Sequence, residues 1–102
     1  MDTDEQFDRA AAMIPFGRFI RVVDRNVQIA FLIRHTDWRP LTAPWWRGKE
    51  VCIVGADLGG NFFLRHCDGS VRYWDHRAER DIVVASSIRA FVSMITNEDM
   101  HA

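Results

Sequence analysis

The sequence predicts an α+β fold in which an antiparallel β-sheet of four to six strands is flanked by N- and C-terminal helices. Several short runs rich in β-branched and aromatic residues favour strands. Between two of these runs stands an Asp68-Gly69 pair, which is typical of a hairpin turn. Near both ends of the chain, apolar residues recur at helical spacing and predict one helix at each end.

Length and composition are those of one globular domain that spans residues 1–102. Apolar residues make up 48% of the chain and charged residues 26%, as in an ordinary soluble domain. The net charge of −1 gives no electrostatic reason to expect direct binding of nucleic acid or of a membrane. Neither a transmembrane segment nor a secretory signal is found, and two cysteines are too few for a disulfide scaffold, so we expect a cytoplasmic protein.

The N-terminal helix is predicted to follow a capping box, with Thr3 at the cap and Gln6 three residues later. One apolar helical face then comprises Phe7, Ala10, Ala11 and Ile14. Pro15 and Gly17 are expected to end this helix.

Residues 18–34 predict two strands, because most of their apolar side chains are β-branched or aromatic. Residues 24–26 would form the turn between them. A helix is the alternative, since Phe19, Val23, Val27 and Phe31 recur every four residues.

Residues 35–49 contain two prolines and a glycine and predict a loop. Three of the four tryptophans of the chain, Trp38, Trp45 and Trp46, lie in it. Tryptophan is frequent among the residues that dominate protein interfaces, so these rings are candidate anchors for a protein partner. The alternative is that they fold back and fill space against the sheet.

Residues 51–54 predict a short buried strand that ends at Gly55, followed by a turn over residues 56–60. A phosphate-binding loop is excluded here, because no Gly-Lys-Ser/Thr or GxGxxG sequence is present and a strand follows.

Residues 61–67 and 70–75 are predicted to pair as a hairpin around a type I′ turn at Asp68-Gly69. In that register Leu64 lies opposite Tyr73, and one face carries Phe62, Leu64, His66, Val71 and Tyr73. Phe63 and Trp74 would then share the other face with Arg65 and Arg72, which we expect to face solvent. A one-residue bulge would reverse this assignment.

Residues 77–81 form a charged connector, and residues 82–84 are expected to add a last edge strand. Ser86 or Ser87 can cap the C-terminal helix. The buried face of that helix is predicted from Ile88, Phe91, Val92 and Ile95, and Asn97 is expected to end it.

The segment from Ile53 to Asn61 (IVGADLGGN) and the segment from Gly69 to His76 (GSVRYWDH) resemble the SUKH superfamily over about residues 51–95. That superfamily includes yeast cell-wall-synthesis regulators and many bacterial immunity proteins. Its members show an apolar strand, a glycine-rich turn with an Asp and an Asn, a Trp-Asp-His-like segment and an amphipathic helix. Leu58 stands where the family often has glycine, and the N-terminal half lacks the family's Pro-x-x-Tyr-like region.

The resemblance implies a non-catalytic protein-binding domain, as in an immunity protein that neutralises a cognate bacterial toxin, commonly a nuclease. A nuclease presents a basic cleft, so carboxylates and aromatic anchors are the expected contacts. The candidate partner-binding residues are Asp37, Trp38, Trp45, Trp46, Asp57, Asp75, His76, Glu79 and Asp81. For Asp57, Asp75 and His76 the alternative is a structural role, in which Asp57 bonds backbone amides of the glycine turn and the other two tie the strand end to the connector. A scaffold or regulatory protein inside the cell is the alternative among binding proteins.

A small enzyme is the rival from another class, with Cys52, His66, Cys67 and His76 as its candidate residues. In the predicted register His66 and Cys67 point to opposite faces, which disfavours their joint action. These residues also lack the paired spacings of a zinc site, so we expect no metal and no cofactor.

Overall fold

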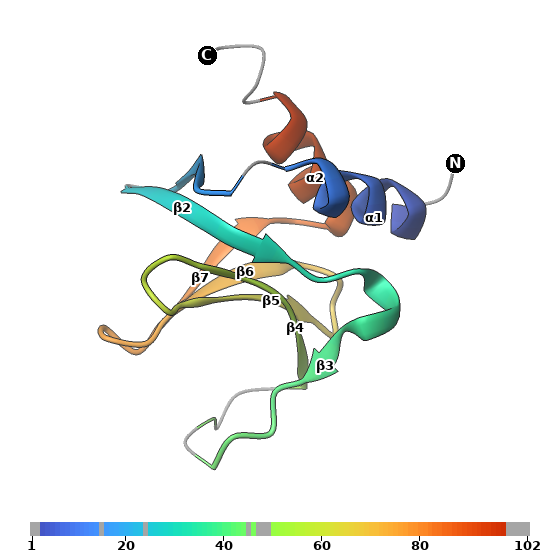
Figure 1. Ribbon diagram of the computed structural model, residues 1–102. Helices are drawn as coiled ribbons and strands as arrows, with labels where there is room; N and C mark the ends of the chain where they lie inside the picture. Colours follow the sequence, from blue (N-terminus) through green and yellow to red (C-terminus); the bar gives the residue numbers. More distant parts are fainter. Residues whose placement is uncertain (1–2, 15, 24, 45, 47–49, 98–102) are drawn as a thin grey trace.

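A computed structural model describes residues 3–14, 16–23, 25–44, 46 and 50–97 (Figure 1). The first half of the chain contains α1 (Thr3–Met13), β1 (Arg18–Val22), β2 (Arg25–Leu32), the 3-10 helix η1 (His35–Asp37) and β3 (Arg39–Pro40). The second half contains β4 (Val51–Asp57), β5 (Phe62–His66), β6 (Val71–Asp75), β7 (Arg80–Ala85) and α2 (Ile88–Asn97). The predicted α+β fold, with an antiparallel sheet and a helix near each end of the chain, is confirmed.

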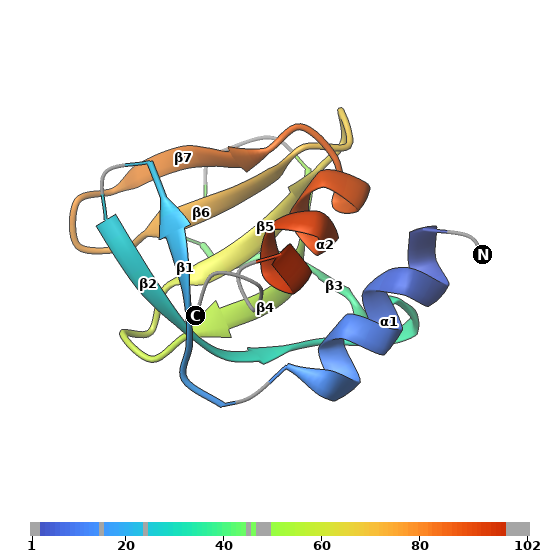
Figure 2. The ribbon, with the colours of Figure 1, turned by 90° about the horizontal axis from the view of Figure 1, so that it is seen from above.

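The strands form one antiparallel sheet in the order β1-β2-β4-β5-β6-β7, and the two-residue β3 pairs with β4 beside this path. Strands that are adjacent in the sheet are also consecutive along the chain, except that β3 lies between β2 and β4 in the sequence. Both helices lie over the same face of the curled sheet (Figures 1 and 2). We call the face beneath the helices the inner face and the opposite one the outer face.

A single apolar core fills the space between the helices and the inner face. Phe91 of α2 lies at its centre, with ring centroids 6.5 Å from Phe7 of α1 and 5.6 Å from Phe63 of β5. One ladder of cross-strand partners runs through the sheet's side of the core: Leu32, Gly55, Phe63, Tyr73 and Ile82. Apart from the glycine, each of these side chains is buried in the core cluster.

Two strands, rather than the alternative helix, form from residues 18–34. Ile20 and Val22 of β1 and Val27 and Ile29 of β2 alternate with more exposed residues and are buried. The turn lies earlier than predicted, because Val22 pairs directly with Arg25. Val23 adopts a left-handed φ of 54° in that turn, and Asp24 lies outside the described residues.

The predicted register of the central hairpin is wrong by one residue. Phe63 pairs with Tyr73 and Leu64 with Arg72. The loop has three residues instead of two: the Gly69 amide donates to the carbonyl of His66 and the His66 amide to that of Ser70. Gly69 has a φ of 90°, whereas Asp68 is not among the residues with positive φ, so a type I′ turn is excluded and a type I turn followed by a glycine bulge takes its place.

The single-residue shift moves side chains between faces, as expected for a period of two. Phe63, predicted to face solvent, is fully buried in the core with Tyr73. Leu64 and His66, predicted to share a face with Tyr73, lie on the outer face instead, opposite Arg72 and Ser70.

Two strands are longer than predicted. β4 continues through Gly55 to Asp57, and the turn is confined to residues 58–60. β7 begins at Arg80, so Asp81, predicted to lie in a connector, is a strand residue opposite Trp74.

The helix ends agree with the sequence to within a residue. Thr3, the expected cap, is the first residue of α1, and Pro15 lies outside the described residues. Ser87 caps α2, because its hydroxyl accepts a hydrogen bond of 3.1 Å from the Ala90 amide. Within the described part of the chain, neither helix has the length and apolar character needed to cross a bilayer.

Candidate functional site

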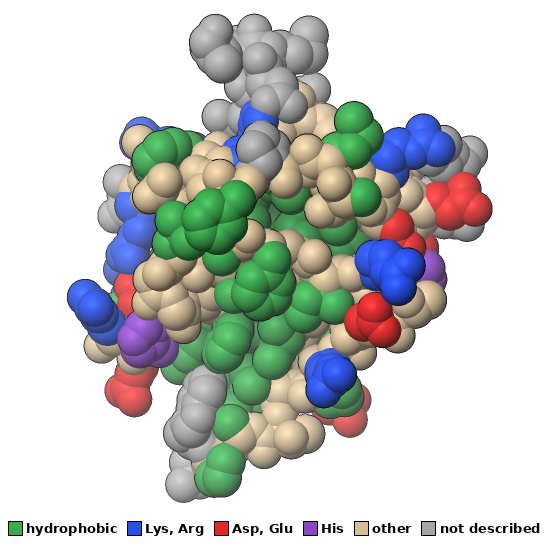
Figure 3. All heavy atoms as spheres, viewed as in Figure 1, with side chains coloured by type: hydrophobic (Ala, Val, Ile, Leu, Met, Phe, Trp, Pro, Cys, Tyr) green, Lys and Arg blue, Asp and Glu red, His purple; other side chains and the backbone are tan. Residues whose placement is uncertain are grey.

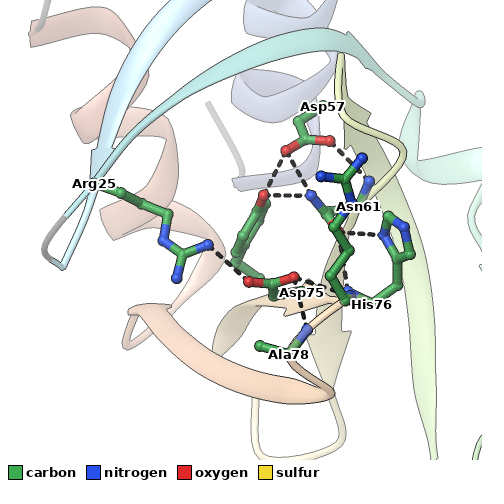
Figure 4. Close-up of polar contacts among 8 residues, drawn as sticks. Arg25, Asp57, Asn61, Asp75, His76 and Ala78 are labelled. Carbon is green, nitrogen blue, oxygen red and sulfur yellow. Dashed lines mark hydrogen bonds and ion pairs between the residues drawn. The ribbon is translucent and has the colours of Figure 1, made fainter.

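The polar residues of the glycine-turn motif bond to one another at the end of β4 (Figure 4). One carboxylate oxygen of Asp57 accepts hydrogen bonds from the amides of Gly59 at 2.9 Å and Asn61 at 2.8 Å, which fixes the turn. The other oxygen accepts from the Tyr73 hydroxyl at 2.5 Å and from the Asn61 side-chain amide at 3.2 Å. Asp57 therefore joins its own turn to β6.

Tyr73 is held in its protonated form. Burial, with the adjacent Asp57 carboxylate adding to its effect, raises the pKa of the Tyr73 hydroxyl well above its usual value. The hydroxyl therefore donates to Asp57 across the whole physiological pH range, and this contact has the properties of a structural bond.

The second half of the motif extends the same network. The amide and the ring Nδ1 of His76 lie 2.9 Å and 2.5 Å from the side-chain oxygen of Asn61. Asp75 accepts from Arg25 at 2.7 Å and from the amides of Arg77 and Ala78 (Figure 4). The network thus ties the β4–β5 turn, the end of β6 and the β1–β2 hairpin together.

Asp75 is ionised at neutral pH. The hydrogen bond from Arg25 is the largest effect on its carboxyl, and the net pKa lies below the usual value although burial opposes the shift. Of the three motif residues named as partner contacts, Asp57 and Asp75 are buried and satisfied by neighbours, and only His76 is exposed.

The outer face of the sheet carries large apolar side chains that the helices do not cover. One cross-strand ladder places Phe31, Ala56, Phe62 and Trp74 on this face. A neighbouring row places Phe19 opposite Gln28, whose carbonyl accepts a hydrogen bond from the Leu58 amide. Figure 3 shows hydrophobic side chains gathered around β2 and below it, toward the segment that follows β3.

Trp46 adds an aromatic ring to the outer face. Its ring lies edge-on to that of Trp74, with centroids 5.0 Å apart. We define the apolar band of the outer face as Phe19, Phe31, Trp46, Leu58, Phe62 and Trp74. Only Trp46 of this set is among the partner residues predicted from the sequence, because the others become neighbours only through strand pairing.

The tryptophans of the predicted loop lie in different surroundings. Trp38 folds back onto the inner side, edge-on to Phe7 at 5.1 Å, and its Nε1 donates to the Ile33 carbonyl at 2.8 Å. Trp38 therefore packs against the core, while Trp46 faces the other side of the sheet. Trp45 lies outside the described residues.

The remaining predicted carboxylates are distributed over separate elements. Asp37 is exposed in η1, with an ion-pair distance of 3.7 Å to Arg34. Glu79 is exposed in the β6–β7 turn with a left-handed φ of 53°. The structure therefore does not gather the predicted acids into one cluster.

Asp81 belongs to a charged group on the outer face. Its carboxylate lies 3.1 Å from Arg72 Nη1 and 3.4 Å from Nε2 of the buried His66. Burial lowers the pKa of His66 below its usual value, more than the neighbouring Asp81 raises it. The ring is accordingly neutral at physiological pH, and the Arg72–Asp81 pair balances its own charge.

A cavity of about 370 Å³ lies between the segment after Arg39, the start of β4 and the end of β5. Its lining includes Cys52, His66 and Cys67, three of the four residues considered for an enzyme. Both thiols are free, and His76 lies elsewhere, at the motif network. Among the described residues, no group of three or more His, Cys, Asp or Glu side chains is arranged to share a metal ion.

Comparison of the chain with protein-family models, with curated proteins and with solved structures gave no match. The SUKH resemblance therefore rests on the motif residues alone.

Proposed function

We propose that this chain is a non-catalytic protein-binding domain, and specifically an immunity protein that neutralises a cognate bacterial toxin inside the cell. The SUKH-like motif supplies the family expectation. The observation that carries the binding function is the apolar band, in which Phe19, Phe31 and Leu58 are about half exposed. An exposed apolar patch of this kind typically marks an interaction surface.

The motif network supports the same proposal, because its polar groups are already bonded within the protein. The side chains of Asp57, Asn61 and Tyr73 form hydrogen bonds with one another. The Asp75 carboxylate accepts hydrogen bonds from Arg25 and from two backbone amides. These residues hold the strand ends in place. Partner contact is therefore proposed for the neighbouring surface, with Trp46 and Trp74 as its aromatic pair.

The test starts from capture of a partner on the tagged protein from its source cell, followed by growth assays. We expect the captured protein to be toxic when expressed alone in bacteria, and co-expression of this chain to restore growth. Trp46→Ala and Phe31→Ala should each weaken binding by more than about 1 kcal/mol, because aromatic anchors dominate interface energies. Val23→Ala, an exposed apolar residue at the tip of the β1–β2 hairpin, is the matched control and should bind normally.

Charge reversal tests whether the partner is a basic nuclease. Asp37→Lys and Glu79→Lys should mainly slow association, and high salt should reduce the difference, because exposed carboxylates steer a basic partner from a distance. An association rate unchanged by both substitutions would remove the nuclease from the proposal. A non-toxic captured partner would favour the scaffold or regulatory alternative.

The cavity with Cys52, His66 and Cys67 keeps a Cys/His-dependent enzyme as the second candidate. A folded variant with Cys52→Ser, Cys67→Ser and His66→Gln distinguishes the two. The proposed binding function requires this variant to keep protecting cells from the toxin. Complete loss of protection with unchanged partner binding would establish the enzyme instead.

A further inference from the structure

The imidazole of His76 uses only one of its two nitrogens within the motif network. Asp57, Tyr73 and Asp75 are buried and Asn61 is half-buried, whereas His76 is exposed. Its Nδ1 lies 2.5 Å from the side-chain oxygen of Asn61 (Figure 4). Within the described part of the chain, no residue forms a hydrogen bond with the other ring nitrogen, Nε2. Nε2 is therefore left over for a contact outside the network.

The network fixes the orientation of the Asn61 amide. The backbone amide of His76 can only donate, so the Asn61 atom 2.9 Å away from it is the oxygen. The Nδ2 group of Asn61 donates to the Tyr73 hydroxyl at 2.7 Å and to the Asp57 carboxylate at 3.2 Å. A flipped amide would place a donor against the His76 amide and an acceptor against the Asp57 carboxylate. Only one orientation of Asn61 therefore satisfies all of these partners.

The fixed oxygen of Asn61 selects one tautomer of the His76 ring. This oxygen accepts hydrogen bonds, so Nδ1 beside it carries a hydrogen. In a neutral imidazole the second nitrogen then carries none and acts as an acceptor. Histidines that bind metals are oriented in the same way, by a hydrogen bond that the other ring nitrogen donates. The network thus holds His76 with an unprotonated Nε2.

The turn beside His76 leaves that part of the ring accessible. A Cβ at Gly60 would lie 3.8 Å from His76 Cε1, the ring atom between the two nitrogens, so any larger residue would cover this edge. Leu58 of the apolar band belongs to the same turn and is 47% exposed. Protein interfaces typically combine an apolar centre with polar contacts at the rim, and His76 is placed to supply such a contact.

We propose that His76 presents Nε2 as the acceptor for an N–H or O–H donor of the protein partner, and that Asn61 is the residue that positions it. A neutral imidazole accepts from a backbone amide, from a hydroxyl and from the lysine or arginine side chains that a basic nuclease would offer. The identity of the partner rests on the proposed function, whereas the presentation of Nε2 rests on the motif network alone.

Nitrogen-15 NMR of the labelled full chain tests the tautomer, at about pH 8.5, where imidazoles are neutral. We expect the proton of His76 on Nδ1, although a free histidine ring prefers Nε2. Asn61→Ala should return the proton to Nε2, and Asn61→Asp, which keeps an oxygen at this place, should hold it on Nδ1. A parent protein with the proton on Nε2 overturns the proposal, as does a folded Asn61→Ala variant with an unchanged tautomer.

Two isosteres of the His76 ring separate partner contact from a purely structural role. Asparagine places its amide near the position of Nδ1 and lacks Nε2, whereas glutamine places its amide near the position of Nε2. We expect His76→Asn to raise the dissociation constant of the partner at least about tenfold, because the partner's donor is left unpaired. His76→Gln should bind at least about threefold more tightly than His76→Asn.

A structural role predicts the opposite order, because only His76→Asn can keep the bond to Asn61. That order, in variants that circular dichroism shows to be folded, overturns the proposal, as does parental affinity in His76→Asn. Val23→Ala, 66% exposed and outside the network, is the control and should bind like the parent.

These measurements fail separately from the proposed function. The spectra need only the chain itself, and the binding assay uses the captured protein whether or not it is toxic. A non-toxic partner that follows the expected order refutes the toxin and supports the His76 contact. A toxin that binds His76→Asn as tightly as the parent refutes the contact and leaves the proposed function standing. Failure to capture any protein overturns the contact together with the function.

Discussion

Two glycines are required for different physical reasons. Gly69 has a φ of 90°, and the space where a Cβ would lie is open. Glycine is therefore required there by the left-handed backbone conformation of the turn and not by crowding. Gly55 has no positive φ, but a Cβ there would lie 2.7 Å from the backbone oxygen of Phe31 and 2.6 Å from Leu32 Cδ2. Gly55 therefore allows the close approach of β2 and β4, next to irregularities in both strand pairings.

Gly55→Ala should destabilise the protein by about 1–3 kcal/mol, since the backbone of β2 must move to admit one methyl group. Gly69→Asn is the comparison, because asparagine tolerates left-handed backbone and meets no neighbour there. Urea unfolding of both variants measures the difference. Equal losses of unfolding free energy would show that the two strands are not in this close contact.

His66 should make stability depend on pH. Its folded pKa is lowered by burial, so in the unfolded chain the ring takes up a proton below about pH 6.5 while the folded protein resists it. The contribution of the neutral ring to the free energy of unfolding is complete above pH 6.5 and is lost as the pH falls below that value. The associated slope is at most about 1.4 kcal/mol per pH unit.

Thermal unfolding between pH 7.5 and 5.5 measures this effect. The midpoint of the parent should fall with decreasing pH more steeply than that of His66→Gln, whatever the absolute stability of the variant. Parallel curves would mean that His66 is protonated equally in both states.

At the scale of elements, the segment between β2 and β4 makes contacts on both faces of the sheet. Its first part is tied to α1, because the amide and the ring Nδ1 of His35 each lie 2.7 Å from the Asp8 carboxylate. Burial raises the pKa of Asp8, but the hydrogen bonds from His35 outweigh it and the net pKa is lowered. Trp38 then packs on Phe7, while Trp46 reaches Trp74 on the outer face.

The two tryptophans should therefore respond differently to truncation. Trp38→Ala should cost about 2–4 kcal/mol of unfolding free energy, since it removes a ring packed against the core and its hydrogen bond to Ile33. Trp46→Ala should cost less than about 1 kcal/mol and act mainly on partner binding. Denaturant unfolding of both variants checks this, and the reverse order would place Trp46 in the core.

At the scale of the whole molecule, one core joins both helices to every long strand. Phe7, Phe63 and Phe91 meet in it from α1, β5 and α2, so no element buries its apolar side chains independently. Cooperative unfolding of a single domain is the expected consequence.

Phe91→Ala should destabilise helices and sheet together, by about 3–5 kcal/mol. Helical circular dichroism and hydrogen exchange of the β5–β6 amides should give the same free energy of unfolding, in the parent and in the variant. Loss of the helical signal while the sheet amides stay protected would contradict a shared core.

Local signals in the sequence determined the kind and order of the elements. β-branched runs predicted β1 and β2, Ser87 capped α2, and glycines marked the turns, because each depends on a few neighbouring residues. Register was decided only by the tertiary structure, since one extra loop residue before Gly69 exchanged Phe63 and Leu64 between faces. The tertiary structure also decided the partners of Asp57, the burial of Trp38 and the apolar band, because residues distant in sequence become neighbours only when the strands pair.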